Sequence, residues 1–211
     1  TIYEYLERYG EAIRDFNAAH QIDPNLKADS KAGNIINYVV QTSNLILSRK
    51  NTKQKKLLEM VKNIPEQIEG ELRFPQVSET APNKLMYKIA AVGDLNQGEN
   101  QGAILTAKVI MHLERKQEVP VSFLAVDKNM TFFVVSFYNT TRSLLEQDKI
   151  KAGDLIYVKN PQLIFTSIEF KGRLYSFQSV KVIELADVLL NGHQPLLENY
   201  AQNSVEIVNF S

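Results

Sequence analysis

The residues best suited to a chemical role form a dense basic segment, residues 49–56. Its five positive charges belong to Arg49, Lys50, Lys53, Lys55 and Lys56. Charge is otherwise balanced, since the whole chain has 24 basic and 24 acidic residues, yet no acidic residue occurs between Asp29 and Glu59. Clustered cations bind phosphate groups, but many charge runs are simply solvated. The sequence therefore leaves two interpretations of the basic segment, a solvated connector or a docking surface.

A row of carboxamide side chains precedes the basic segment. It consists of Asn34, Asn37, Gln41 and Asn44. Their spacings of three, four and three residues place them along one face of a helix. A carboxamide can donate a hydrogen bond to a carbonyl and accept one from an amide, so this amide row is able to hold the backbone of an extended peptide. The alternative is an ordinary solvated helix face, and both interpretations stay open.

The sequence offers little for catalysis or metal binding. His20, His112 and His193 are far apart and lie in a helical, a strand-like and a turn-like setting. Cysteine is absent, which excludes thiolate catalysis and cysteine-ligated zinc or iron–sulfur sites. Residues 93–102 contain three glycines but match no phosphate-binding loop, and no metalloprotease or nucleophile-elbow motif occurs. We therefore expect a non-enzymatic protein without a cofactor or a metal.

The composition is that of an ordinary globular chain, with 211 residues of which 44% are hydrophobic and 23% charged. No apolar run approaches the ~20 residues that cross a bilayer. The N-terminus carries Glu4, Glu7 and Arg8 where a signal peptide requires an apolar core, so we expect a cytoplasmic or nuclear location. Because Thr1 already lies inside a helical pattern, we also expect the C-terminal portion of a longer protein.

The first third of the chain has the periodicity of helices. Apolar residues recur every three or four positions in residues 5–25, which predicts one amphipathic helix. Its match to the second helix of a tetratricopeptide repeat, where small residues let helices approach closely, rests on Ala12, Phe16, Ala19 and Pro24. A capping helix is expected over residues 26–49 and a short third helix over 57–64. Because one repeat does not bury its apolar face alone, further repeats are expected before Thr1.

From residue 85 onward the pattern changes to short strands separated by turn-forming residues. Strands are predicted at residues 85–92, 103–113, 119–126, 131–138, 155–158, 163–170, 173–183 and 205–210. With a short helix predicted at 142–148, this order matches an OB-fold, a five-stranded Greek-key β-barrel. The prediction is thus an α+β chain with a helical unit at 1–68, a linker at 69–84 and an OB-fold domain at 85–211.

Charge and aromatic content bear on what the predicted barrel binds. Residues 86–211 include 12 basic and 13 acidic residues, whereas binding to nucleic-acid phosphates needs a positive surface. The aromatic side chains of the strands are able to stack on bases or to fill the barrel, and the inward–outward alternation of strands favours the core role. The charge balance favours a protein partner for the barrel.

Several motifs of the strand region occur together in a recognisable order. Two runs carry most of the signal, KGRLYSFQSVKV from Lys171 and DVLLNGHQP from Asp187. Shorter motifs lie at 102–103, 108–109, 119–120, 126–127, 138–139 and 153–154. In these motifs the chain resembles the tetratricopeptide repeat protein five (Strap) family, although the loop at 93–102 and the tail at 198–211 depart from its pattern. That family joins a tetratricopeptide array to a C-terminal OB-fold, and the resemblance implies the same architecture here.

The resemblance implies an adaptor that recognises the N-terminal peptide of nascent tubulin at the ribosome and promotes decay of tubulin messenger RNA with mRNA-decay adaptor proteins. In the family the repeat groove holds the peptide, and a basic segment between repeats and barrel contacts ribosomal RNA. That segment corresponds to residues 52–60 here. The resemblance therefore assigns the RNA contact to Lys53, Lys55 and Lys56, with Arg49 and Lys50 beside them.

A second role of the family is nuclear. The resemblance implies a stress-responsive transcription cofactor that serves as a scaffold for a histone acetyltransferase coactivator and an actin-nucleating cofactor. Its OB-fold would then bind single-stranded DNA or protein. The two roles together imply both cytoplasmic and nuclear locations.

Overall fold

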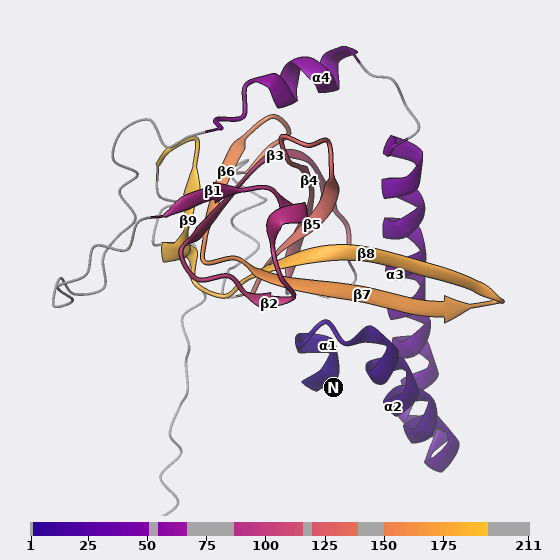
Figure 1. Cartoon of the computed structure of the whole chain (residues 1–211). Helices are drawn as coiled ribbons and strands as arrows, with labels where there is room; N and C mark the ends of the chain where they lie inside the picture. Colours follow the sequence, from indigo (N-terminus) through magenta and orange to yellow (C-terminus); the bar gives the residue numbers. More distant parts are fainter. Residues whose placement is uncertain (1, 51–54, 67–86, 116–119, 139–149, 194–211) are drawn as a thin grey trace, which may run out of the picture.

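The computed structural model describes residues 2–50, 55–66, 87–115, 120–138 and 150–193. The side chains of Lys50 and Lys56 are not described. Within these ranges the chain forms a group of N-terminal helices followed by a curled sheet, as Figure 1 shows. The predicted linker at 69–84, the helix at 142–148 and the strand at 205–210 lie outside the described residues, and so these three predictions stay open.

Six strands make the barrel. They are β3 (Ala103–Leu113), β4 (Val121–Val126), β5 (Phe132–Phe137), β6 (Leu155–Lys159), β7 (Gln162–Phe170) and β8 (Arg173–Val182). β3, β4 and β5 pair in antiparallel order, β5 pairs with β8 in parallel, and β8 pairs antiparallel with β7. Only Asn160 and Pro161 separate β7 from β6, which pairs back onto β3. β6 and β7 therefore act as one bent strand, and the result is the predicted five-stranded OB-fold barrel.

Alternation along the strands places one set of side chains inside the barrel. Buried inward residues come from every barrel strand, including Leu105, Phe123, Phe133, Phe137, Ile156, Leu163 and Val180. The register of β3 shifts between Val109 and Met111, which is a β-bulge that lets this long strand pair with β6 at one end and with β4 at the other. The predicted role of most aromatic side chains as core is confirmed for these phenylalanines.

Three short strands extend the sheet. β1 (Lys88–Ala90) pairs in parallel with β3, β2 (Gly98–Glu99) pairs with β7, and β9 (Val188–Leu190) pairs with β6. The prediction of one strand over 85–92 was too long, because residues 92–94 form a single turn of 3₁₀ helix. β2 and β9 were not predicted, since strands this short leave almost no alternation in the sequence.

The helices are α1 (Ile2–Tyr5), α2 (Tyr9–Ile22), α3 (Ala28–Lys50) and α4 (Lys55–Lys62). The prediction of one continuous helix over 5–25 was wrong at its start. The chain breaks between α1 and α2, where Glu7 has a φ of 55° in the left-handed region and its side chain is buried. At the other end, Pro24 follows α2 as predicted, and the Asp23 carboxylate accepts a hydrogen bond from the Asn25 amide.

The helices lie against the outer surface of the barrel. In Figure 1, α3 runs beside the long β7–β8 hairpin and α4 crosses over β3, and contacts between these elements confirm the placement. Every residue of β4 and β5 is buried, on the outward face as well as the inward one. The outward side chains Leu124, Val126, Phe132 and Val134 share one buried cluster with Tyr9, Phe16, Ile35, Val39, Leu57 and Val61 of the helices.

Replacing an outward barrel residue beneath the helices tests this arrangement. We expect Leu124→Ala to lower the free energy of unfolding by about 2–5 kcal/mol, as for a core leucine, because the helices leave this side chain fully buried. The measurement is urea unfolding followed by circular dichroism. Leu174→Ala is the matched control, since Leu174 is 72% exposed and should change stability by less than about 0.5 kcal/mol. Equal, small effects of the two substitutions would contradict the covered face.

Candidate interaction surfaces

A buried polar cluster around Glu7 joins the helices to the barrel. Glu7 is only 2% exposed, and its Oε1 accepts a hydrogen bond from the Tyr138 hydroxyl at 2.9 Å. Lys181 Nζ, from β8, donates to the Tyr5 carbonyl at 2.9 Å and lies 3.8 and 4.3 Å from the ring centroids of Tyr5 and Tyr138. We call this set of residues, together with Arg115, the Glu7 hub. It ties the break between α1 and α2 to two parts of the barrel.

Arg115 completes the hub just beyond the end of β3. Its Nη1 donates to the Tyr9 hydroxyl at 3.3 Å, and its Cζ lies 4.2 Å from the ring centroid of Tyr38 on α3. Tyr38 in turn packs edge-on against Phe177 of β8. A buried carboxylate is costly unless cations and donors surround it, and the hub supplies both. Charge and aromatic stacking therefore act together at this interface.

Burial changes how the hub titrates. Burial, together with the nearby Glu7 carboxylate, raises the pKa of Tyr138 far above its usual value. Burial also raises the pKa of Tyr9, and it raises the pKa of Tyr38 to about 12. The pKa of Lys181 is lowered by burial, and the attraction of Glu7 opposes that shift. The three tyrosines stay neutral at physiological pH, so the Tyr138 hydroxyl remains a donor to Glu7.

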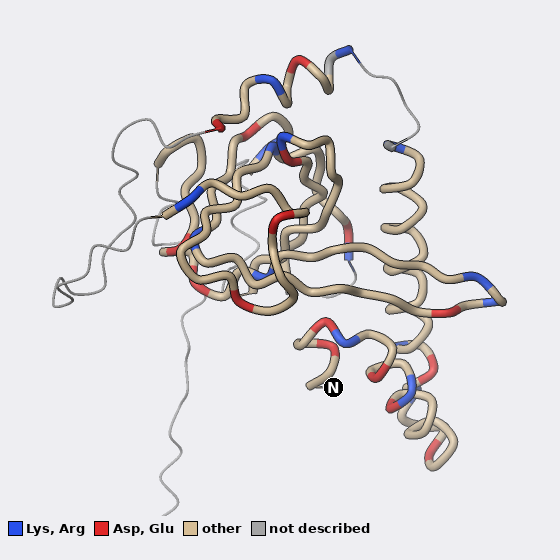
Figure 2. The backbone as a smooth tube through the Cα atoms, in the orientation of Figure 1, with Lys and Arg blue, Asp and Glu red and all other residues tan. Residues whose placement is uncertain are grey.

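The basic segment lies between α3 and α4. Arg49 is partly exposed near the end of α3, and Lys55 is exposed at the start of α4. Figure 2 shows basic residues at both ends of this connection. Lys50 and Lys56 occupy the adjoining helical positions, and Lys53 lies outside the described residues. The structure thus places the two side chains that it describes at solvent-accessible ends of two neighbouring helices.

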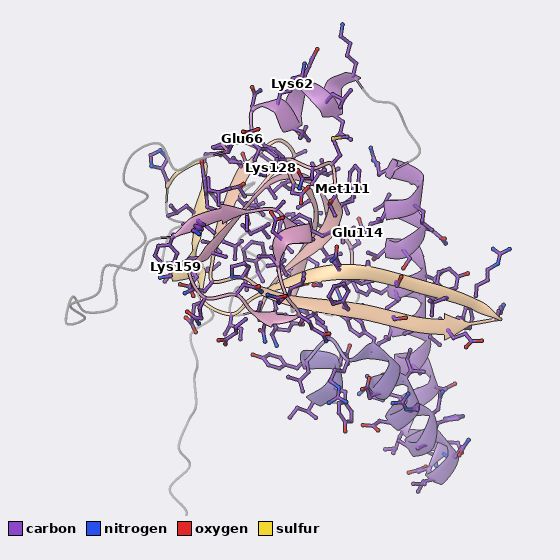
Figure 3. The ribbon with its side chains drawn as sticks, in the orientation of Figure 1. Lys62, Glu66, Met111, Glu114, Lys128 and Lys159 are labelled. Carbon is purple, nitrogen blue, oxygen red and sulfur yellow. The ribbon has the colours of Figure 1, made fainter. Side chains whose placement is uncertain are left out.

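α4 is held on the barrel by its apolar face. Leu57, Val61 and the following Ile64 are buried in the cluster between helices and barrel, and α4 contacts β3. In Figure 3, Lys62 lies on α4 and Met111 of β3 lies on the barrel below it. Lys55 and Lys62 are exposed while the apolar residues of the same helix are buried. Packing of α4 therefore fixes the start of this helix, and with it the end of the basic segment, to the barrel.

The amide row lies on the face of α3 that points away from the barrel. Asn37, Gln41 and Asn44 are exposed and Asn34 is partly exposed, whereas Ala32, Ile35, Tyr38, Val39, Thr42 and Ile46 are buried on the opposite side. The predicted apolar stripe was partly wrong, because Leu47 is exposed and the buried face is centred on Ile35 and Val39. The structure brings the four carboxamides together along one exposed helix face, as their spacing predicts.

The described residues hold no group of three or more histidine, aspartate or glutamate side chains arranged for a metal ion. A hollow of about 230 Å³ lies between the β6–β7 bend and the end of β8, where Lys159 (Figure 3) and Asp187 form an ion pair at 3.1 Å. Its walls are largely charged and it is smaller than most ligand cavities. No helix in the described ranges is long and apolar enough to cross a membrane.

The sequence analysis did not single out the hub residues. Glu7 and Arg115 look like ordinary surface charges in the sequence, and Lys181 is a lone lysine in a strand. One signal was available, because VSFLAV and FFVVSF of β4 and β5 show no polar alternation. A barrel strand that is apolar on both faces needs a covering element.

Comparison with known proteins agrees with this architecture. Residues 86–204 match the family model of the tetratricopeptide repeat protein 5 OB fold domain. Over 193 residues the chain is 27% identical to tetratricopeptide repeat protein 5 from Mus musculus and from Homo sapiens, covering 91% of this chain and 43% of each relative. The chain thus spans less than half the length of these curated relatives. An NMR structure of an OB domain from Methanosarcina mazei is 17% identical with a TM-score of 0.32, covering 48% of this chain and 80% of that one.

The raised tyrosine pKa values predict a loss of stability at alkaline pH. Below pH ~10, the ordinary pKa of tyrosine, neither state ionises and the stability is fully present. Above it the unfolded chain ionises while buried Tyr9, Tyr38 and Tyr138 do not, so stability falls by about 1.4 kcal/mol per pH unit for each tyrosine. Lys181, whose pKa is lowered, has the opposite sign, but it is one group against three.

The measurement is the free energy of unfolding by urea between pH 8 and 11.5. We expect a plateau below about pH 10 and a decline above it. Tyr38→Phe removes one of the three raised groups and should make the decline shallower by about a third. A stability that stays flat to pH 11.5, or a slope unchanged by Tyr38→Phe, would contradict the assigned cause.

Proposed function

Because the chain belongs to the tetratricopeptide repeat protein 5 family, as its match over residues 86–204 establishes, we propose that it is a non-enzymatic adaptor of tubulin autoregulation. In this role it recognises nascent tubulin peptide at the ribosome and promotes decay of tubulin messenger RNA. The family match and the OB-fold bear out the resemblance drawn from the sequence motifs. The tubulin and ribosome assignments rest on that resemblance and on the surfaces described above.

One observation supports ribosome docking most directly, the anchoring of α4 on the barrel. Docking onto RNA needs cations held in a defined place, since a freely moving chain loses conformational freedom on binding. Buried Leu57, Val61 and Ile64 hold α4 on the barrel while Lys55 stays exposed at its first turn. Lysines gain nothing from the helix dipole at this end of α4, so stability does not explain their placement. A contact with RNA phosphates does explain it.

The amide row fits the peptide-binding part of the proposal. Asn34, Asn37, Gln41 and Asn44 line the outward face of the helix that leads into the basic segment. Carboxamides on such a face satisfy the backbone of a peptide regardless of its side chains. We prefer this adaptor role to the nuclear DNA-binding role, because the outward faces of β4 and β5 are covered by helices.

Charge reversal tests the ribosome contact. We expect the triple substitution Lys53→Glu, Lys55→Glu and Lys56→Glu to weaken co-sedimentation with ribosomes that carry nascent tubulin by at least about tenfold, because each lysine lost removes one phosphate contact. The salt dependence of binding should also become less steep by about three contacts.

The control is a triple reversal of exposed cations on the barrel, Lys151→Glu, Lys171→Glu and Arg173→Glu. It changes the net charge by the same amount and should leave binding nearly unchanged. If both triple variants weaken binding equally, net charge rather than the basic segment is responsible. Unchanged binding by the first variant would remove the ribosome contact from this segment.

Truncation of two carboxamides tests the peptide contact. We expect Asn37→Ala combined with Gln41→Ala to weaken binding of a fluorescently labelled N-terminal tubulin peptide by about 5- to 30-fold, through the loss of one or two hydrogen bonds. Fluorescence anisotropy measures the dissociation constant. Asn17→Ala, an exposed carboxamide on α2, is the control and should have no effect. An unaltered dissociation constant for the double variant would show that the amide row is only a solvated face.

A further inference from the structure

The barrel face that OB-folds commonly use for oligonucleotides is occupied in this chain. That face is formed by the second and third barrel strands, which here are β4 and β5. Their outward apolar residues pack against α2, α3 and α4 in one buried cluster. The outward polar residues are equally covered, since Ser122, Ser136 and Ser179 have no exposed surface and their hydroxyls follow one another at 3.2 and 3.4 Å. Base stacking needs ring faces that solvent can reach.

The helices also supply the groups that a nucleic acid would bring to this face. A single-stranded ligand offers an anion to cations and aromatic rings to stacking partners. Glu7 provides a buried carboxylate, and its charge acts on both Lys181 and Arg115. Tyr5 covers the ammonium group of Lys181, and Tyr9 and Tyr38 lie beside the guanidinium of Arg115. Both buried cations of this face are therefore already satisfied from within the chain.

We propose that the N-terminal helices are a built-in occupant of the oligonucleotide face, with the Glu7 hub standing in for a phosphate and its bases. The barrel of the closed chain then binds no single-stranded nucleic acid at this face, which serves as the docking surface for the helices. This inference goes beyond the proposed ribosome contact. The basic segment lies outside the covered face, so RNA docking there requires no opening of the barrel.

The absence of cysteine from the chain allows a direct test. Ser136→Cys places a thiol on the outward face of β5, and Ser176→Cys places one at an exposed position of β8. We expect a maleimide to label the first variant at least about 100-fold more slowly than the second, because buried groups react only through local opening. An excess of oligo-dT of 15 nucleotides should leave both rates unchanged. Ser122→Cys on β4 serves as a second buried site should Ser136→Cys lower stability.

Both variants are made in the Lys53→Glu, Lys55→Glu and Lys56→Glu background, which removes any oligonucleotide bound through the basic segment. Labelling of the buried sites as fast as at position 176 would show that the face is open and overturn the proposal. Acceleration by oligo-dT, or saturable oligo-dT binding in this background at physiological salt, would show that nucleic acid displaces the helices and would overturn it equally. Slow labelling that is insensitive to oligo-dT supports the built-in occupant and leaves the ribosome test independent.

Discussion

Burial of β4 and β5 on both faces is the constraint on which the rest of the structure depends. An isolated barrel would expose Leu124, Val126, Phe132 and Val134 to water, at a cost of about 1.5–3 kcal/mol for each large side chain. The helices remove this cost by packing on the same strands. Helices and barrel therefore share one buried cluster, and neither the position of α3 nor that of α4 is independent of the barrel.

The Glu7 hub adds specificity to this apolar contact. Apolar surfaces can slide past one another, whereas a carboxylate that must meet Tyr138, with Lys181 and Arg115 close by, accepts only one arrangement. With the inner face of α3 fixed in this way, its amide row faces outward and leads directly to the basic segment. Both candidate binding surfaces thus belong to the helices, and the barrel serves to hold them in place. This division suits an adaptor that contacts peptide and RNA on adjoining surfaces.

Much of the fold could be read from the sequence because the long strands carry their own signal. The alternation and β-branched content of residues 103–113 and 173–182 predict β3 and β8, and Pro24 predicts the end of α2. The OB-fold order and the family motifs were recognisable for the same reason. The spacing of Asn34, Asn37, Gln41 and Asn44 also sufficed to place them on one helix face, since a helix fixes neighbours at three and four residues.

The tertiary structure alone decided what each helix faces. The partners of the hub are separated by more than a hundred residues, as with Glu7 and Tyr138, and no local pattern connects them. The break at Glu7 likewise follows from burial of its carboxylate against the barrel, which overrides the helical periodicity of residues 5–25. Local periodicity determines which elements form, because it depends on neighbouring residues. The pairing of surfaces depends on long-range packing and on the burial of charge, and these exist only once the chain has folded.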